Sequence, residues 1–246
     1  MTTVITGAGN GLGRGLALAA ATRGDDVLAV DHDEAALGEL GLPSLALDLT
    51  AQDAAERLAD AAAPISLIIH SAGISGTGPF EAIPAAHHAR ILKLNFEAPV
   101  TITCHLLAVG AMAPRSTHAF VGSLSTFTGY PGAVSYAASK DGLASFAGSL
   151  RKALPKGQTA AIIYPGPMAT DHAARYAPDN SEKTVAARQK PEEAADIILK
   201  ALAAGRHTII PGAKAKLLAT AGRAAPRAIS KALKRGLYDK IPDPKL

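Results

Sequence analysis

Short aliphatic segments alternate with longer alanine-rich segments of helical period along most of this chain. This alternation constrains the fold more than any other feature, because strands separated by helices form βαβ units whose parallel sheet is covered on both faces. We therefore expect a doubly wound α/β domain with a seven-stranded parallel sheet. The strands are expected at 3–6, 27–30, 45–47, 65–69, 118–122, 159–164 and 207–210, and the helices near 12–23, 33–40, 51–62, 84–110, 135–154 and 191–204.

The domain is expected to span residues 1–212, followed by a basic helical extension at 213–246. Residues 167–190 are bounded by prolines and separate the sixth strand from the last helix of the domain, so we expect a lid there. The single cysteine, Cys104, excludes an intramolecular disulfide and fits a reducing compartment. No apolar run approaches the roughly 20 residues that cross a bilayer, and no secretory signal precedes the first strand. A cytoplasmic protein is expected.

The extension carries most of the positive charge. Residues 206–246 hold ten Lys/Arg and two Asp/Glu, a charge of +8, so the first 205 residues carry −4 of the net +4. After Pro226, a favourable first helical residue, Ile229, Leu233 and Leu237 form an apolar stripe. Such a helix packs on its own domain or a sister subunit, or lies on an acidic membrane; we favour packing on protein. It lacks the interleaved aromatics of nucleic-acid-binding segments, so no nucleic acid is expected.

A glycine-rich turn joins the first strand to the first helix and reads Thr6-Gly7-Ala8-Gly9-Asn10-Gly11-Leu12-Gly13. Glycines allow a tight bend and close backbone approach, and the free N–H groups of a helix N-terminus bind phosphate. The spacing is T-G-x-x-x-G-x-G rather than G-x-G-x-x-G, and an ordinary strand–helix junction is the alternative. The turn predicts a pyrophosphate site on a Rossmann-type sheet.

Asp31 closes the second strand. A carboxylate there accepts hydrogen bonds from both hydroxyls of an adenosine ribose and repels a 2′-phosphate. The alternative is a helix N-cap for residues 33–40. The neighbours His32 and Asp33 supply no arginine or lysine, and Asn10 occupies another position where a phosphate-binding base could stand. The balance favours NAD over NADP.

Tyr136 and Lys140 are four residues apart in a helical segment, so their side chains share one face. A free phenol has a pKa of about 10 and is a poor base at neutral pH. A nearby ammonium group favours the phenolate and lowers that pKa, as does an oxidised nicotinamide ring. Alone, the pair is weak evidence, because most such pairs decorate solvated helix faces.

Together these motifs resemble the short-chain dehydrogenase/reductase family in its compact form, over residues 2 to about 212. The glycine turn matches the cofactor turn of the family, and Tyr136-x-x-x-Lys140 matches its active-site motif. Ser123 stands thirteen residues before the tyrosine, where the family keeps a serine, and Asn95 matches an asparagine of the fourth helix. Two further segments are similar: Asp48-Leu49, and Pro165-Gly166-Pro167-Met168-Ala169-Thr170.

The resemblance implies a nicotinamide-dependent oxidoreductase. Tyr136 would exchange a proton with the substrate, Ser123 would hold the substrate oxygen, Lys140 would bind the nicotinamide ribose and tune the tyrosine, and Asn95 would hold a relay water. Besides Tyr136, Lys140 and the glycine turn, the cofactor would meet Asp31, Asp48, Leu49, Ala72, Gly73, Pro165, Gly166, Met168 and Thr170.

One segment departs from the pattern of the family. Where the family has Asn-Asn-Ala-Gly after the fourth strand, this chain has His70-Ser71-Ala72-Gly73. Binding through the main chain of this segment survives the change, but the role of the first asparagine falls to His70. We expect a buried, hydrogen-bonded structural histidine there rather than a catalytic one.

The substrate is less constrained. Candidate pocket walls at 75–80, 124–127, Tyr130, Met168 and Tyr176 contain no arginine or lysine, although Arg175 stands in the lid. A neutral, largely apolar secondary alcohol or ketone is therefore favoured, with no metal ion.

The resemblance also implies a homodimer or homotetramer built partly on the helices at 84–110 and 135–154. A cofactor-sensing regulator that has lost turnover is the alternative function. The intact set of Ser123, Tyr136 and Lys140 favours an enzyme, because a sensor has no need of a proton-transfer tyrosine.

Overall fold

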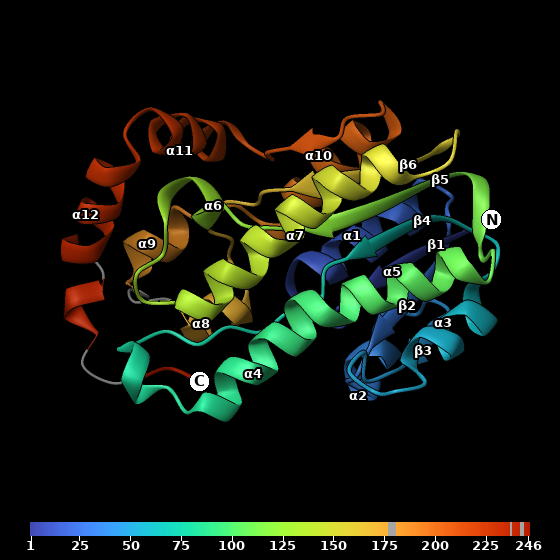
Figure 1. The fold of residues 1–246 in the computed structure, drawn as a ribbon, viewed down its shortest axis with the longest axis horizontal. Coiled ribbons are helices and arrows are strands. Elements are labelled where there is room, and N and C mark those ends of the chain that lie inside the picture. Colours follow the sequence, from blue (N-terminus) through green and yellow to red (C-terminus); the bar gives the residue numbers. More distant parts are fainter. Residues whose placement is uncertain (177–180, 237, 242–243) are drawn as a thin grey trace.

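A single parallel sheet organises the chain in the computed structural model, which describes residues 1–176, 181–236, 238–241 and 244–246 (Figure 1). The strand order is β3-β2-β1-β4-β5-β6-β7, and each neighbouring pair is parallel. The strands are β1 (Thr2–Thr6), β2 (Asp26–Asp31), β3 (Ser44–Ala46), β4 (Ile65–His70), β5 (Met112–Val121), β6 (Gln158–Ile163) and β7 (Thr208–Ile209). The seven-stranded doubly wound sheet expected from the sequence is confirmed. Its order reverses between β1 and β4, and ligands of such sheets bind beyond the carboxyl ends of the strands at that point.

Helices cover both faces of the sheet. The main ones are α1 (Gly11–Thr22), α2 (Glu34–Gly38), α3 (Ala54–Ala62), α4 (Ala85–Leu92), α5 (Ala98–Ala108), α7 (Val134–Ala153) and α10 (Pro191–Ala203). Successive strand residues point to opposite faces. Ile5 therefore packs in the core under α1 and α10, whereas Val4 packs in the core under α3 and α5. Because both faces are buried, the strands are nearly continuous apolar runs.

The long helix expected at 84–110 is interrupted. Between α4 and α5 the chain forms a five-residue π-helix, η2 (Lys93–Glu97), centred on Asn95. Pro99, in the first turn of α5, has no N–H and therefore cannot donate to the carbonyl four residues earlier, which is that of Asn95. Single π turns of this kind occur frequently at functional sites.

Short elements fill the connections at the carboxyl edge of the sheet. They are η1 (Phe80–Ala82), α6 (Ser125–Thr128), α8 (Asp171–Tyr176) and α9 (Glu182–Ala186). The last two belong to the lid segment expected at 167–190, of which residues 177–180 lie outside the described residues. The strand expected at 118–122 is also longer than the sequence pattern indicated, because β5 begins at Met112.

The basic extension folds back on the rest of the chain. It consists of α11 (Ala213–Ala224), α12 (Pro226–Gly236) and η3 (Tyr238–Lys240). A Cβ on Gly222 would lie 2.4 Å from the Phe127 carbonyl oxygen, so α11 packs backbone to backbone on α6. Ile229 and Leu233 of the expected apolar stripe are half-buried, and Leu237 lies outside the described residues. In the part of the chain that is described, no helix combines the length and apolarity needed to cross a membrane.

Candidate active site

The glycine turn lies between β1 and α1, at the switch point of the sheet. Gly7 has a φ of +69°, and a Cβ there would lie 2.7 Å from the Ala72 Cα. A Cβ on Gly13 would lie 2.0 Å from the Gly7 carbonyl oxygen. Side chains are thus excluded where the turn closes on itself. The first N–H groups of α1 have no intrahelical acceptor, and the Asn10 side chain does not cap them. They are available to an anion.

Asp31 holds the adjacent edge of the turn. Its carboxylate accepts hydrogen bonds from the N–H of Gly9 at 2.9 Å and of Asp33 at 3.1 Å, and it lies 2.8 Å from His32 Nδ1. Asp33, not Asp31, caps α2, because its side chain accepts from the Ala36 N–H at 3.0 Å. The N-cap alternative for Asp31 is therefore wrong. Asp31 stands at the carboxyl end of β2 beside the turn, where an adenosine ribose would lie.

The segment 70–73 is held by a threonine. Thr6 Oγ1 accepts hydrogen bonds from the N–H groups of Ser71 at 3.1 Å and Ala72 at 3.3 Å. His70 is buried, its ring stacks on Phe120 with centroids 4.8 Å apart, and Nε2 lies 3.4 Å from Thr103 Oγ1. Burial lowers the pKa of His70 to about 3, so its ring is neutral. These contacts confirm the expected structural histidine.

Asn95 connects the π turn to this segment. Its Oδ1 accepts from the Ile74 N–H at 2.9 Å, and its Nδ2 donates to the Ile74 carbonyl at 2.9 Å and to Ser139 Oγ at 3.1 Å. The side chain is fully buried. A Cβ on Gly73 would lie 3.1 Å from Asn95 Oδ1 and 3.4 Å from Lys140 Nζ. Asn95, Gly73 and Lys140 therefore meet at one point of the site.

Tyr136 and Lys140 share the face of α7 that the sequence predicted. The Lys140 Nζ lies 5.8 Å from the centroid of the Tyr136 ring and donates to the Val121 carbonyl at 2.8 Å. Ser123, just after β5, lies close enough to the phenol to favour its ionised form, and its Oγ accepts from the Ser125 N–H at 3.2 Å. The four residues expected to form a catalytic set are thus brought together from β5, η2 and α7.

The pKa of Tyr136 differs from the lowered value that its lysine neighbour led us to expect. Burial raises the pKa of Tyr136 to about 12, although the Ser123 hydrogen bond lowers it. Burial also lowers the pKa of Lys140 to about 8. In the protein alone, desolvation of the phenolate therefore outweighs the stabilisation expected from the ammonium group. At neutral pH Tyr136 is a phenol.

The segment after β6 lies against the glycine turn. A Cβ on Gly11 would lie 3.2 Å from Thr170 Cγ2. Thr170 Oγ1 accepts from the Ala173 N–H at 3.1 Å at the start of α8, and Asn10 Nδ2 donates to the Asp171 carboxylate at 2.8 Å. Met168 forms an isolated parallel bridge with Gln189. Thr170, and Asp171 after it, thus border the glycine turn, whereas Gly166 lies against Leu124 and Ala215.

The remaining expected cofactor contacts lie at the end of β3. The Asp48 carboxylate accepts from the N–H of Thr50 at 2.9 Å and from its hydroxyl at 2.8 Å, and these bonds lower the pKa of Asp48. The Leu49 side chain is buried in the core under α3 and α5, so chiefly its main chain is left for a ligand.

The sequence did not single out His172 in α8. Its ring centroid lies 6.2 Å from that of Tyr136 and 4.8 Å from that of Tyr176. Nothing in the sequence marked this histidine, because its place beside Tyr136 depends on how α8 folds back. Likewise, no sequence pattern indicated that Lys245 pairs with Thr77, on the segment that follows β4.

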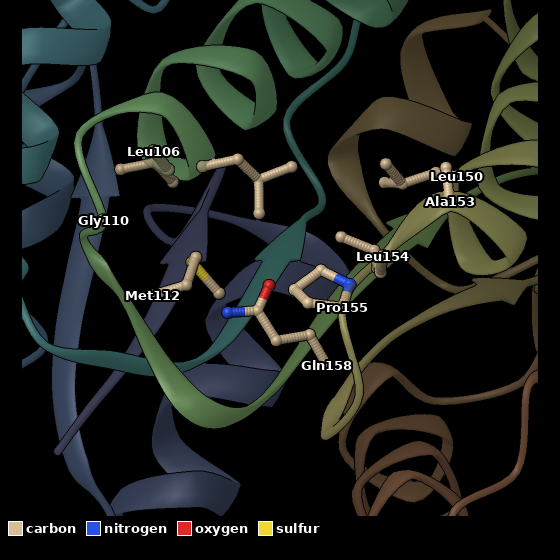
Figure 2. Close-up of a pocket in the computed structure, with 9 residues that line it drawn as sticks. Leu106, Gly110, Met112, Leu150, Ala153, Leu154, Pro155 and Gln158 are labelled. Carbon is tan, nitrogen blue, oxygen red and sulfur yellow. The ribbon is translucent and has the colours of Figure 1, made fainter.

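A cavity of about 290 Å³ lies at the opposite end of the strands (Figure 2). Leu106, Met112, Leu150, Leu154 and Gln158 contribute to its walls, where β5 and β6 begin. It is therefore remote from the glycine turn at the carboxyl edge. A second hollow of about 280 Å³ adjoins the turn itself, and its walls include Asn10, Gly11, Arg14, Thr170, Asp171 and Lys190.

The family model described as short chain dehydrogenase matches residues 1–181. The chain belongs to this family. An uncharacterised oxidoreductase of Myxococcus xanthus (strain DK1622) is 34% identical over 179 residues, which cover 67% of this chain and 71% of that protein. The D-erythrulose reductase of Gallus gallus is 32% identical over 105 residues, covering 41% of this chain and 43% of that enzyme. The protein is thus an oxidoreductase of the short-chain dehydrogenase family.

Solved structures agree on the fold. A short-chain dehydrogenase/reductase from Burkholderia phymatum in complex with NAD has a TM-score of 0.77 at 19% identity, covering 89% of this chain and 91% of that chain. A short-chain dehydrogenase from Burkholderia cenocepacia J2315 in complex with NADP has a TM-score of 0.79 at 24% identity, covering 94% and 96%. One holds NAD and the other NADP, so the comparison leaves the choice of cofactor open.

Proposed function

We propose that this protein interconverts a neutral secondary alcohol and its ketone with NAD(H) as the preferred cofactor. The observation that carries the proposal is the meeting of Ser123, Tyr136, Lys140 and Asn95 beside Gly73, next to a turn whose Gly7 and Gly13 leave no room for a side chain. The ketose named in the D-erythrulose reductase relative is itself a ketone, which supports a carbonyl substrate.

The residues present fit a dinucleotide. The free N–H groups at the start of α1 would hold the pyrophosphate, Asp31 the adenosine ribose, and Lys140 the nicotinamide ribose. Ala72, Gly73, Asp48, Leu49 and the segment from Pro165 to Thr170 would complete the binding surface. When bound, the cofactor supplies the acceptor or donor of the hydride.

The side chains divide the remaining work. Tyr136 as a phenol donates its proton to a carbonyl oxygen in the reductive direction and recovers it from the alcohol in the other. Ser123 hydrogen-bonds the same oxygen and holds it near the phenol. Asn95, whose amide bonds to the Ile74 main chain, keeps the π turn in place. Beside Lys140, it would help to relay the proton that replaces the one given up by Tyr136.

A homodimer or homotetramer is part of the proposal. The family resemblance assigns the interface to α4, α5 and α7, which pass in front of the sheet (Figure 1). Leu92 and Val134 on these helices are large apolar side chains that are exposed in the single chain. A second copy would cover them. Light scattering measures the number of subunits directly.

The preference for NAD is tested at Asp31. We expect the wild-type protein to bind NADH more tightly than NADPH, because the carboxylate accepts from the ribose hydroxyls and repels a 2′-phosphate. Asp31→Ala should narrow that difference by about tenfold or more, since both effects are removed. Cofactor titration by fluorescence measures both affinities. Asp33→Ala is the matched control, because it removes a neighbouring carboxylate that caps α2. Equal affinities in the wild type would refute the preference.

Turnover is tested on a panel of secondary alcohols and ketones, followed by NADH absorbance. We expect conversion of at least one neutral ketone. Failure of the whole panel with both NADH and NADPH would refute the proposed activity and favour a cofactor-sensing regulator.

A further inference from the structure

His172 stands opposite Tyr136 on the lid side of the site. It is the second residue of α8, and its ring makes a T-shaped contact with the buried ring of Tyr176, with centroids 4.8 Å apart. The centroid of the Tyr136 ring lies 6.2 Å away, with the two ring planes tilted by 44°. The imidazole thus lies beside the phenol and packs against a second aromatic ring.

The position of α8 is fixed at both ends. Thr170 accepts from the Ala173 N–H, Asp171 accepts from Asn10 of the glycine turn, and Tyr176 is buried at the other end. These contacts tie the helix to the turn on one side and to the core on the other. His172 is therefore held at a defined place beside the phenol.

The polar atoms of this ring are unused. Among the described residues, no hydrogen-bond partner of either ring nitrogen of His172 is found, and the side chain is open to solvent. The protein packed around the rest of the ring desolvates it, and this effect, ahead of the cations Lys140 and Arg175, lowers the pKa of His172 below its usual range. At neutral pH the ring accordingly offers one N–H donor and one acceptor nitrogen.

A hydroxyl group is the matching partner. A hydroxyl can pair with either ring nitrogen, because it both donates and accepts, whereas a carbonyl or carboxylate oxygen only accepts. Because the two ring centroids are only 6.2 Å apart, a small substrate that contacts the phenol also lies beside the imidazole, and a hydrogen bond of about 3 Å from an adjacent carbon's oxygen can reach it. One oxygen would contact the Tyr136 phenol, and the other the His172 imidazole.

We infer that His172 binds a substrate hydroxyl on the carbon next to the reacting one, so that the preferred substrates are α-hydroxyketones and the corresponding vicinal diols. This inference rests on the proposed function and narrows its substrate class. His172 is then a specificity-determining residue, because a substrate that lacks the hydroxyl loses this hydrogen bond.

The first test compares two ketones that differ by one hydroxyl, 3-hydroxy-2-butanone and 2-butanone, with NADH and with NADPH. The measured quantity is the ratio of their kcat/KM values. His172→Phe keeps a ring and removes both nitrogens, and should lower this ratio about tenfold or more relative to wild type. His172→Asn keeps a donor and an acceptor and should restore part of it. His207→Phe, at an exposed histidine before β7, is the matched control and should leave the ratio unchanged.

The second test detects ligand binding at His172 by NMR, without turnover. In Tyr136→Phe protein saturated with NAD⁺ and labelled with ¹⁵N-histidine, 2,3-butanediol should shift the ring resonances of His172, and 2-butanol should not. An unchanged kcat/KM ratio in His172→Phe, in an enzyme that reduces both ketones, overturns the inference and leaves the proposed function intact. No turnover of either ketone by the wild type, with His172 resonances that still respond to the diol alone, overturns the function and supports the hydroxyl site. No turnover and no response overturns both.

Discussion

At the scale of single residues, burial controls the protonation of the catalytic pair: it raises the pKa of Tyr136 to about 12 and lowers the pKa of Lys140 to about 8. Ser123, Tyr136, Lys140 and Asn95 could be selected because their spacing matches a family motif, and the structure brings all four together. Their pKa values could not be predicted, because the spacing of two residues on a helix says nothing about how deeply both are buried. The pKa of Tyr136 is accordingly raised, where an ammonium neighbour alone would have lowered it.

His118, in β5, is a buried histidine that lowers the stability of the folded protein. It is 0% exposed, and neither ring nitrogen has a hydrogen-bond partner within the described structure. His118→Leu removes both unpaired atoms and should raise the free energy of unfolding by about 1–3 kcal/mol at pH 7, measured by urea denaturation. His207→Leu, at an exposed histidine, should change it by less than about 0.5 kcal/mol.

His118→Leu should also make the stability of the protein depend less on pH in the acid range. Burial lowers the pKa of His118 to about 4, whereas the unfolded chain keeps a value near 6.5. The unfolded state therefore binds more protons below pH 6.5, and stability is lost as the pH falls from about 6.5 toward about 4. His118→Leu should lose less stability over this range than wild type. A wild-type protein of equal stability at pH 7 and pH 5 would contradict the neutral buried ring.

At the scale of secondary-structure elements, strands and helices could be predicted where a periodic apolar pattern was long enough. All seven strands were predicted, although β5 begins at Met112, before its predicted start, and its pairing with β4 shifts register between Ile65 and Leu67. The π turn could not be predicted, since it arises from Asn95 bonding to Ile74, a contact between distant residues, together with Pro99. The short helix α8 also escaped prediction, and the position of His172 with it.

The packing of α11 on α6 can be tested by comparing two variants, each with one glycine replaced by alanine. Gly222→Ala places a Cβ 2.4 Å from the Phe127 carbonyl and should lower the free energy of unfolding by about 1–3 kcal/mol. Gly148→Ala, in α7, meets nothing within 4 Å outside its own helix and should raise it by about 0.5–1 kcal/mol, because alanine favours the helix. Thermal or urea unfolding compares the two. An extension that is detached from the domain would make both substitutions equally mild.

At the scale of the whole molecule, the carboxyl edge of one sheet collects the chemistry. The glycine turn, Asp31, the 70–73 segment, Ser123 and the start of α8 all follow strands of this sheet, which is why residues far apart in sequence share one site. The basic extension returns to the same edge, where Lys245 pairs with Thr77. The extension therefore has a structural role on its own chain, as its half-buried stripe indicates.

The central claim is that the phenol of Tyr136 moves the proton at a dinucleotide site. The most direct measurement compares wild type and Tyr136→Phe for reduction of a ketone that the wild type accepts, together with NADH binding by fluorescence. We predict a loss of kcat of at least about 100-fold in Tyr136→Phe with NADH affinity nearly retained, and a much smaller loss in Tyr130→Phe, at a half-buried neighbouring tyrosine. A Tyr136→Phe protein that reduces the ketone as fast as wild type would contradict the claim.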